Sequence, residues 1–118
     1  MLVDDNESLL EATRRFLRGR GFNVRATSSP FGVTALIQRE QPSVVILDVM
    51  MPGLDGGALA KLLGARSERD SYSVILYSAL PEEELYRLAR TLPGCLYLSK
   101  TVGVEALAAM VLRCRGNA

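Results

Sequence analysis

Short apolar runs and longer stretches of mixed polarity alternate about five times along this chain of 118 residues. Most of the apolar runs are continuous, which is typical of strands buried on both faces of a parallel sheet. One run differs, because Phe22, Val24 and Ala26 alternate with polar residues, so we place that strand at a sheet edge. The predicted strands are residues 2–3, 22–26, 44–47, 74–77 and 96–98.

The stretches between the strands carry apolar residues at the three- and four-residue spacing of a helix with one buried face. The first helix should end near Gly19, the second should begin at residues 28–30, and the fourth should begin at Pro81. Strands that alternate with helices in this way predict an α/β fold with a parallel sheet and helices on both faces. At this length we expect one domain, over residues 1–118.

Composition excludes several classes of protein. Hydrophobic residues make up 48% of the chain, which is too many for a disordered chain, and no apolar run approaches the roughly 20 residues of a membrane-spanning helix. The formal net charge of +1 gives no reason to expect contact with nucleic acid. Cys95 and Cys114 lack a metal-binding spacing and are typical of reduced thiols, which favours a cytoplasmic protein. The lack of histidine excludes histidine-based catalysis and histidine metal ligands.

Polar residues follow four of the predicted strands at the point where each strand ends. Asp4 and Asp5 follow the first strand, Asp48 the third, Ser78 the fourth, and Lys100 closely follows the fifth. The carboxyl ends of parallel strands meet at one edge of the sheet, and open α/β sheets bind their ligands there. Three carboxylates, a hydroxyl and an ammonium in one crevice suit a Mg²⁺ ion and a phosphoryl group.

The adjacent aspartates favour a metal site over a purely structural role. Two carboxylates about 4 Å apart repel each other by roughly 4 kcal/mol at an effective dielectric of about 20, and a divalent cation removes that cost. The alternative is that Asp4 and Asp5 cap the helix that follows them, but capping needs only one aspartate.

Asp48 is the favoured nucleophile, because a carboxylate at a strand end can form an acyl phosphate. Asp55 is a competing carboxylate, although it lies in a Pro-Gly-Leu-Asp-Gly turn whose local hydrogen bonds explain an aspartate there. Ser78 can donate a hydrogen bond to a phosphoryl oxygen, and Lys100 can supply a positive charge for it.

Four short motifs occur in order along the chain. They are Leu-Val-Asp-Asp at 2–5, Ile-Leu-Asp-Val-Met-Met-Pro-Gly-Leu-Asp-Gly at 46–56, Tyr-Ser-Ala at 77–79 and Tyr-Leu-Ser-Lys at 97–100. Together they resemble the response-regulator receiver domain, the phosphorylated module of two-component signalling, over essentially the whole chain. The resemblance implies a doubly wound, flavodoxin-like (βα)5 fold, with a five-stranded parallel sheet in the order 2-1-3-4-5.

The resemblance also implies a role for each residue of the predicted site. Asp48 corresponds to the phosphoacceptor and Lys100 to the lysine that binds the phosphoryl group. Asp4, Asp5 and Asp48 correspond to the Mg²⁺ ligands, of which Asp5 is the more direct, and Met50 corresponds to the residue that offers its backbone carbonyl to the metal.

Two further residues correspond to the family's conformational switch. Ser78 aligns with the switch hydroxyl and Tyr97 with the aromatic residue that moves with it; the alternative is that Tyr97 is a half-buried aromatic that never moves. The chain departs from the family after the lysine, where Thr101 replaces the usual proline. A cis bond before a residue other than proline costs about 2.5–4 kcal/mol, so we expect a trans bond, which could place Lys100 differently.

We therefore predict that the protein takes a phosphoryl group onto Asp48 from a histidine kinase or a histidine phosphotransfer protein, with Mg²⁺ as cofactor. Such a domain promotes only its own phosphorylation and dephosphorylation and is not otherwise an enzyme. The fourth helix, fifth strand and fifth helix would form the output surface. That surface would bind an output domain or a target protein, or would pair two copies after phosphorylation.

Two other functions stay open at this point. A degenerate receiver would bind its partners without phosphorylation, and Thr101 is the main feature in its favour. A Mg²⁺-dependent hydrolase of phosphorylated small molecules would need a specificity element such as a cap insertion, and the sequence contains none.

Overall fold

The strands form one sheet in which all neighbours are parallel and the order is β2-β1-β3-β4-β5. This computed structural model describes residues 1–29, 32–50, 59–61, 63, 65, 72–92 and 95–116. The strands are β1 (Leu2–Val3), β2 (Ala26–Thr27), β3 (Val44–Leu47), β4 (Ser73–Ser78) and β5 (Cys95–Ser99). The predicted fold class and strand order are confirmed.

Helices follow the strands in the alternating order that the sequence predicts. They are α1 (Glu7–Gly19), α2 (Val33–Glu40), α4 (Glu82–Arg90) and α5 (Val104–Gly116), and a 3₁₀ turn, η1 (Lys100–Val102), precedes α5. The described residues between 59 and 65 are also helical. None of the helices within the described ranges is both long and apolar enough to cross a membrane.

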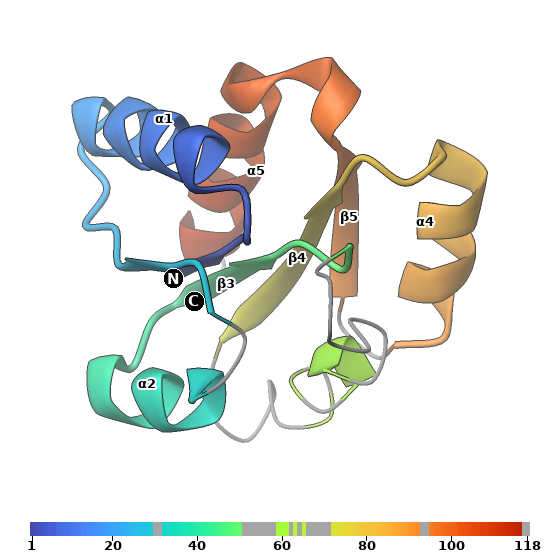
Figure 1. The fold of residues 1–118 in the computed structure, drawn as a ribbon, viewed down its shortest axis with the longest axis horizontal. Helices are drawn as coiled ribbons and strands as arrows, with labels where there is room; N and C mark the ends of the chain where they lie inside the picture. The colour runs from blue at the N-terminus through green and yellow to red at the C-terminus, as the bar shows by residue number, and fades with distance from the viewer. Residues whose placement is uncertain are drawn as a thin grey trace.

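The sheet separates two apolar cores. Figure 1 shows α1 and α5 on one side of the sheet and α2 and α4 on the other. Successive residues of a strand point to opposite faces, so Val45 and Leu47 of β3 pack under α2 and α4, while Val44 and Ile46 pack under α1 and α5. Both faces of the central strands are therefore buried, which explains their continuous apolar runs.

The strand register brings the predicted site residues to nearly the same level. Val3 of β1 pairs with Leu47 of β3, so the next residues, Asp4 and Asp48, leave the sheet side by side. On the other side of β3, Leu47 pairs with Leu76, so that Ser78 extends one residue beyond the level of Asp48.

The edge strand β2 is shorter than predicted, and it begins later. The sequence predicted residues 22–26, whereas the ladder contains only Ala26 and Thr27. The reason is the partner: β2 pairs only with β1, and β1 has two residues, Leu2 and Val3, to offer. Val24 is still buried in the core under α1 and α5. The alternating apolar residues therefore predicted the buried side chain correctly but not which residues pair with β1.

The second helix also begins later than predicted. Gly32 precedes it with a φ of 77°, in the left-handed region, so the right-handed helix starts only at Val33. Pro30, which was expected near the first turn, lies outside the described residues. The fourth helix begins at Glu82 after Pro81, as predicted, and ends at Arg90.

Candidate functional site

Three carboxylates gather where β1 and β3 end. One ligand oxygen from each of Asp4, Asp5 and Asp48 lies within 4.8 Å of the others, and no other such acidic group exists among the residues that the structure describes. Asp4 and Asp48 are 4% and 5% exposed, whereas Asp5 is exposed. The site thus combines two buried carboxylates with one that faces solvent.

The capping alternative for the two aspartates is wrong. Asn6 is the N-cap of α1, and its Oδ1 accepts a hydrogen bond from the amide of Leu9 at 3.1 Å. Asp4 supports this turn from the other side, because its Oδ1 accepts a hydrogen bond from the amide of Asn6 at 3.0 Å. Asp5 makes no side-chain hydrogen bond or ion pair with the residues described, so its carboxylate is unengaged.

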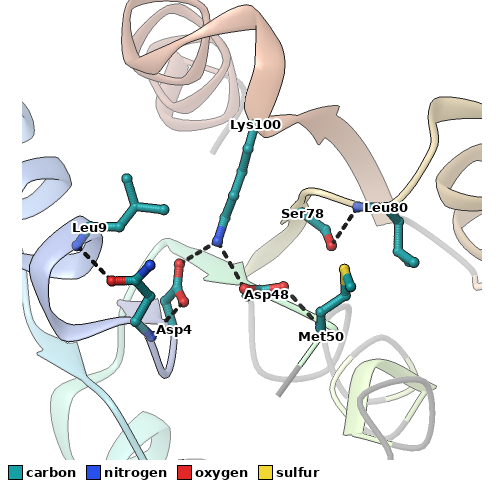
Figure 2. Close-up of polar contacts among 8 residues, drawn as sticks. Asp4, Leu9, Asp48, Met50, Ser78, Leu80 and Lys100 are labelled. Carbon is teal, nitrogen blue, oxygen red and sulfur yellow. Dashed lines mark hydrogen bonds and ion pairs between the residues drawn. The ribbon is translucent and has the colours of Figure 1, made fainter. Parts of the chain in front are cut away.

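Lys100 reaches across the sheet to the buried carboxylates. Its Nζ lies 2.6 Å from Oδ2 of Asp4 and 2.8 Å from Oδ2 of Asp48, and it bridges the two (Figure 2). Burial lowers the pKa of Lys100, but the hydrogen bonds to the two aspartates and their negative charges together outweigh burial, so the pKa is raised. Burial raises the pKa of Asp4 even though the hydrogen bond from Lys100 acts in the opposite direction.

The second oxygen of Asp48 is also engaged. Its Oδ1 accepts a hydrogen bond from the amide of Met50 at 2.9 Å, while the Met50 side chain is 50% exposed. The sequence singled out Met50 for its carbonyl and missed this amide contact. Aspartate side chains often accept a hydrogen bond from the backbone amide two residues later, in an Asx-turn. That preference is the sequence signal that could have predicted the contact between Asp48 and Met50.

Ser78 is fully buried at the end of β4, with no exposed surface. Its Oγ accepts a hydrogen bond from the amide of Leu80 at 3.3 Å (Figure 2). The hydroxyl proton of Ser78 has no acceptor among the described residues. A buried hydroxyl with an unused proton can donate to a group that enters the site.

Two tyrosines outside the acidic cluster complete the surroundings. Tyr97 is half-buried on β5, and its ring meets that of Tyr86 on α4 edge to face, with 5.8 Å between ring centroids. The ring of Tyr77 lies beneath Lys100, whose Nζ is 5.9 Å from the ring centroid. The sequence singled out Tyr97, included Tyr77 only as part of the Tyr-Ser-Ala motif, and gave no role to Tyr86.

Thr101 does not keep Lys100 away from the aspartates. No cis peptide bond occurs in the described part of the chain, and Lys100 still reaches Asp4 and Asp48. Asp55, the competing carboxylate, lies outside the described residues.

Comparison with known proteins gives the family. The profile of the response regulator receiver domain matches residues 1–112. This chain belongs to that family. The receiver domain is one part of two-component response regulators and is not generally an enzyme in the usual sense. Receiver domains generally bind Mg²⁺ at an acidic cluster, and Asp4, Asp5 and Asp48 form such a group here.

Individual relatives agree with this assignment. The chain is 33% identical over 115 residues to the probable transcriptional regulatory protein TcrX of Mycobacterium tuberculosis, a match that covers 98% of this chain and 47% of TcrX. It is 29% identical over 113 residues to protein RcaC of Microchaete diplosiphon, covering 96% of this chain and 17% of RcaC. The receiver domain therefore spans about half or less of the length of these relatives.

Solved structures share the fold. The signal receiver domain of the NarL response regulator of Mycobacterium tuberculosis superposes with a TM-score of 0.80 at 27% identity, over 99% of this chain and 94% of that one. The receiver domain of the Francisella response regulator 1452 gives a TM-score of 0.83 at 24% identity, over 98% and 94% of the two chains.

Proposed function

We propose that this receiver domain accepts a phosphoryl group on Asp48 from a phosphohistidine of a histidine kinase or a histidine phosphotransfer protein. The observation that carries this proposal is the placement of Asp48. Its carboxylate is nearly buried and lies between the ammonium of Lys100 and the amide of Met50, with the unused hydroxyl proton of Ser78 on the neighbouring strand. Hydrogen-bond donors and a positive charge placed in this way can stabilise the negative charge of a phosphoryl group attached to Asp48.

The transfer is a displacement at phosphorus. An oxygen of Asp48 forms the new O–P bond while the N–P bond to the donor imidazole breaks, and the bonding electron pair stays on the imidazole. The product is an acyl phosphate, which adds roughly −1.5 to −2 of charge to the site. Because this chain contains no histidine, the donor belongs to another protein or another region.

Lys100 and Ser78 would stabilise the added charge. In the structure the ammonium of Lys100 is paired with both Asp4 and Asp48, and a phosphoryl group on Asp48 would offer its Nζ new oxygens at the same place. The hydroxyl of Ser78 would donate to another phosphoryl oxygen. Both groups act by position and charge, which is how most phosphoryl-transfer sites work.

The acidic group fits a hard divalent cation. Asp5 has an unengaged carboxylate in the group, while Asp4 and Asp48 supply buried oxygens, and the backbone carbonyl of Met50 is the further ligand that family resemblance implies. Such a donor set, made only of oxygens and open to solvent at Asp5, suits Mg²⁺. When bound, Mg²⁺ would supply positive charge for the carboxylates and for the phosphoryl oxygens.

We further propose that phosphorylation changes the surface formed by α4, β5 and α5. Ser78 would move toward the phosphoryl group, and Tyr97 would follow into the space that Ser78 leaves. This surface would then bind an output domain, a target protein or a second copy of the chain. The change is a shift between two populated states and not a new fold.

Acetyl phosphate with Mg²⁺ tests the proposal directly. Intact-mass measurement should find one added phosphoryl group on the wild-type domain and none on Asp48→Asn, since an amide is a poor nucleophile. Asp55→Asn is the matched control and should be phosphorylated at the wild-type rate. Phosphorylation of Asp48→Asn at that rate would place the reaction on Asp55 or Asp4, and an unmodified wild type would favour the degenerate receiver.

A further inference from the structure

The residues on either side of Lys100, Ser99 and Thr101, are hydrogen-bonded to each other. Ser99 ends β5 and caps η1, and its Oγ accepts a hydrogen bond from the amide of Thr101 at 3.2 Å. The hydroxyl groups of Ser99 and Thr101 also form a hydrogen bond of 2.8 Å. Lys100 is thus the middle residue of a small closed turn made by its two neighbours.

This turn depends on the backbone amide of Thr101. The amide of Thr101 is the donor, and a proline in its place would have no N–H to give. Proline would also disfavour the helical conformation that Lys100 adopts in η1. Thr101 therefore allows a lysine turn that a proline at this position would prevent.

The turn decides where the ammonium of Lys100 lies. The ladder between β4 and β5 fixes the backbone of Ser99 opposite Ser78, so the direction of the next residue follows from the conformation of η1. From that position the side chain spans β4 and reaches Asp48 at the end of β3 and Asp4 at the end of β1. A flexible lysine holds such a contact only when its backbone already aims it correctly.

We propose that Ser99 and Thr101 are positioning residues for Lys100, and that their hydrogen-bonded turn aims its side chain at Asp4 and Asp48. Neither residue touches the carboxylates, and both act through the backbone of Lys100. Their effect on phosphoryl transfer rests on the proposed function, but their effect on the lysine itself does not.

The chain contains its own reference for an experiment. Lys61, the other lysine, is exposed, whereas the side chain of Lys100 is 14% exposed and doubly paired. Reductive methylation at limiting reagent, followed by peptide mass spectrometry, gives the ratio of labelling at Lys100 to labelling at Lys61 within one sample. Loss of fold is monitored separately by circular dichroism.

Ser99→Ala should raise this ratio by about three- to tenfold, because both hydrogen bonds of the turn are lost. Ser99→Thr keeps the hydroxyl and should restore the wild-type ratio. Thr101→Val keeps the amide donor and should stay within about twofold of wild type. An unchanged ratio in Ser99→Ala, or the same increase in Ser99→Thr, would overturn the proposal.

Phosphorylation by acetyl phosphate separates the two proposals. If wild type is phosphorylated, Ser99→Ala should react about three- to tenfold more slowly and Ser99→Thr at nearly the wild-type rate. Equal rates for wild type and Ser99→Ala would overturn the positioning role and leave the proposed function intact. If wild type is not phosphorylated, the proposed function fails, and the labelling ratio still decides the position of Lys100.

Discussion

The carboxylates of the site lie at the centre of the sheet, whereas Tyr97 lies on the outer strand β5 and Lys100 directly follows that strand in η1. β3 is hydrogen-bonded to a strand on each side, and all four of its residues are buried. β5 pairs only with β4, and its residues are half-buried or exposed. Asp48 is therefore fixed by two ladders and two cores, whereas Lys100 and Tyr97 depend on one ladder and on local contacts.

This difference suits a signalling domain. A phosphoacceptor must stay in place to be recognised by its donor, while the surface that reports its state must be able to change without unfolding the protein. An outer strand with few buried contacts can shift at low cost, because local stability follows burial and hydrogen bonding. The four predictions below test whether the centre and the outer strand differ in the way that these contacts imply.

The largest expected effect is on folding. Leu47→Ala removes a side chain with no exposed surface at the centre of the sheet, and should lower the free energy of unfolding by about 2–5 kcal/mol. Leu96→Ala, on the outer strand, removes a side chain that is 42% exposed and should change it by less than about 1 kcal/mol. Urea denaturation measures both. Equal losses would mean that the outer strand is as tightly packed as the centre.

The next largest effect is expected from removing the ammonium of Lys100, which links the outer strand to the carboxylates at the centre of the sheet. Lys100→Ala leaves two nearly buried carboxylates without their cation, and should lower the free energy of unfolding by about 1–3 kcal/mol in metal-free buffer while the domain stays folded. Mg²⁺ should recover part of the loss. Thermal unfolding with and without Mg²⁺ checks this, and Lys61→Ala, at an exposed position, is the control. If Mg²⁺ stabilises Lys100→Ala no more than wild type, the lysine and the metal do not share these carboxylates.

Metal affinity should depend most on the one exposed carboxylate. Mg²⁺ should bind with a dissociation constant in the sub-millimolar to millimolar range, because the site is open and solvated, and Asp5→Asn should weaken binding by about tenfold or more. Glu7→Gln removes a nearby exposed charge that is not in the group and should change the affinity by less than about twofold. Titration calorimetry measures both, and equal affinities for wild type and Asp5→Asn would remove Asp5 from the metal site.

The central half of the site could be predicted from the sequence more fully than the outer half. Continuous apolar runs identify strands, and the polar residue that ends each run must lie at the carboxyl edge of the sheet. Asp4 and Asp48 follow such runs and are adjacent, as the register of Val3 with Leu47 requires. The sequence did not reveal which of three consecutive residues caps α1, since Asp4, Asp5 and Asn6 are all suitable caps.

The outer half depends on geometry that no periodicity encodes. The bridge from Lys100 to both aspartates is set by a three-residue turn, η1, and the sequence only indicated that Thr101 changes it. The short β2 follows from the length of its partner strand and not from its own residues. The pairing of Tyr86 with Tyr97 joins a helix to a strand, and its geometry becomes visible only when α4 is placed against β5.

The smallest expected effect is on the balance between the two positions of Tyr97 in the proposed switch. Edge-to-face contact between Tyr86 and Tyr97 should stabilise the present position of Tyr97 by about 0.5–1.5 kcal/mol, since aromatic pairs contribute that much beyond their buried area. Tyr86→Ala removes the contact and should shift the population toward the other position of Tyr97 by about two- to tenfold. Tyr86→Phe keeps the ring and is the matched control.

Hydrogen exchange across residues 79–100, with and without beryllofluoride as a mimic of the phosphoryl group, measures this balance. In wild type and Tyr86→Phe, beryllofluoride should change protection there more than in α1, because Ser78 directly precedes this stretch and Tyr97 lies within it. In Tyr86→Ala part of that change should already be present before beryllofluoride is added. Changes confined to the residues around Asp48 would mean that the outer strand does not respond, and that the domain holds a phosphoryl group without transmitting it. Identical exchange in all three proteins would instead show that Tyr86 does not hold Tyr97, and that the half-buried position of Tyr97 on β5 is set by the strand alone.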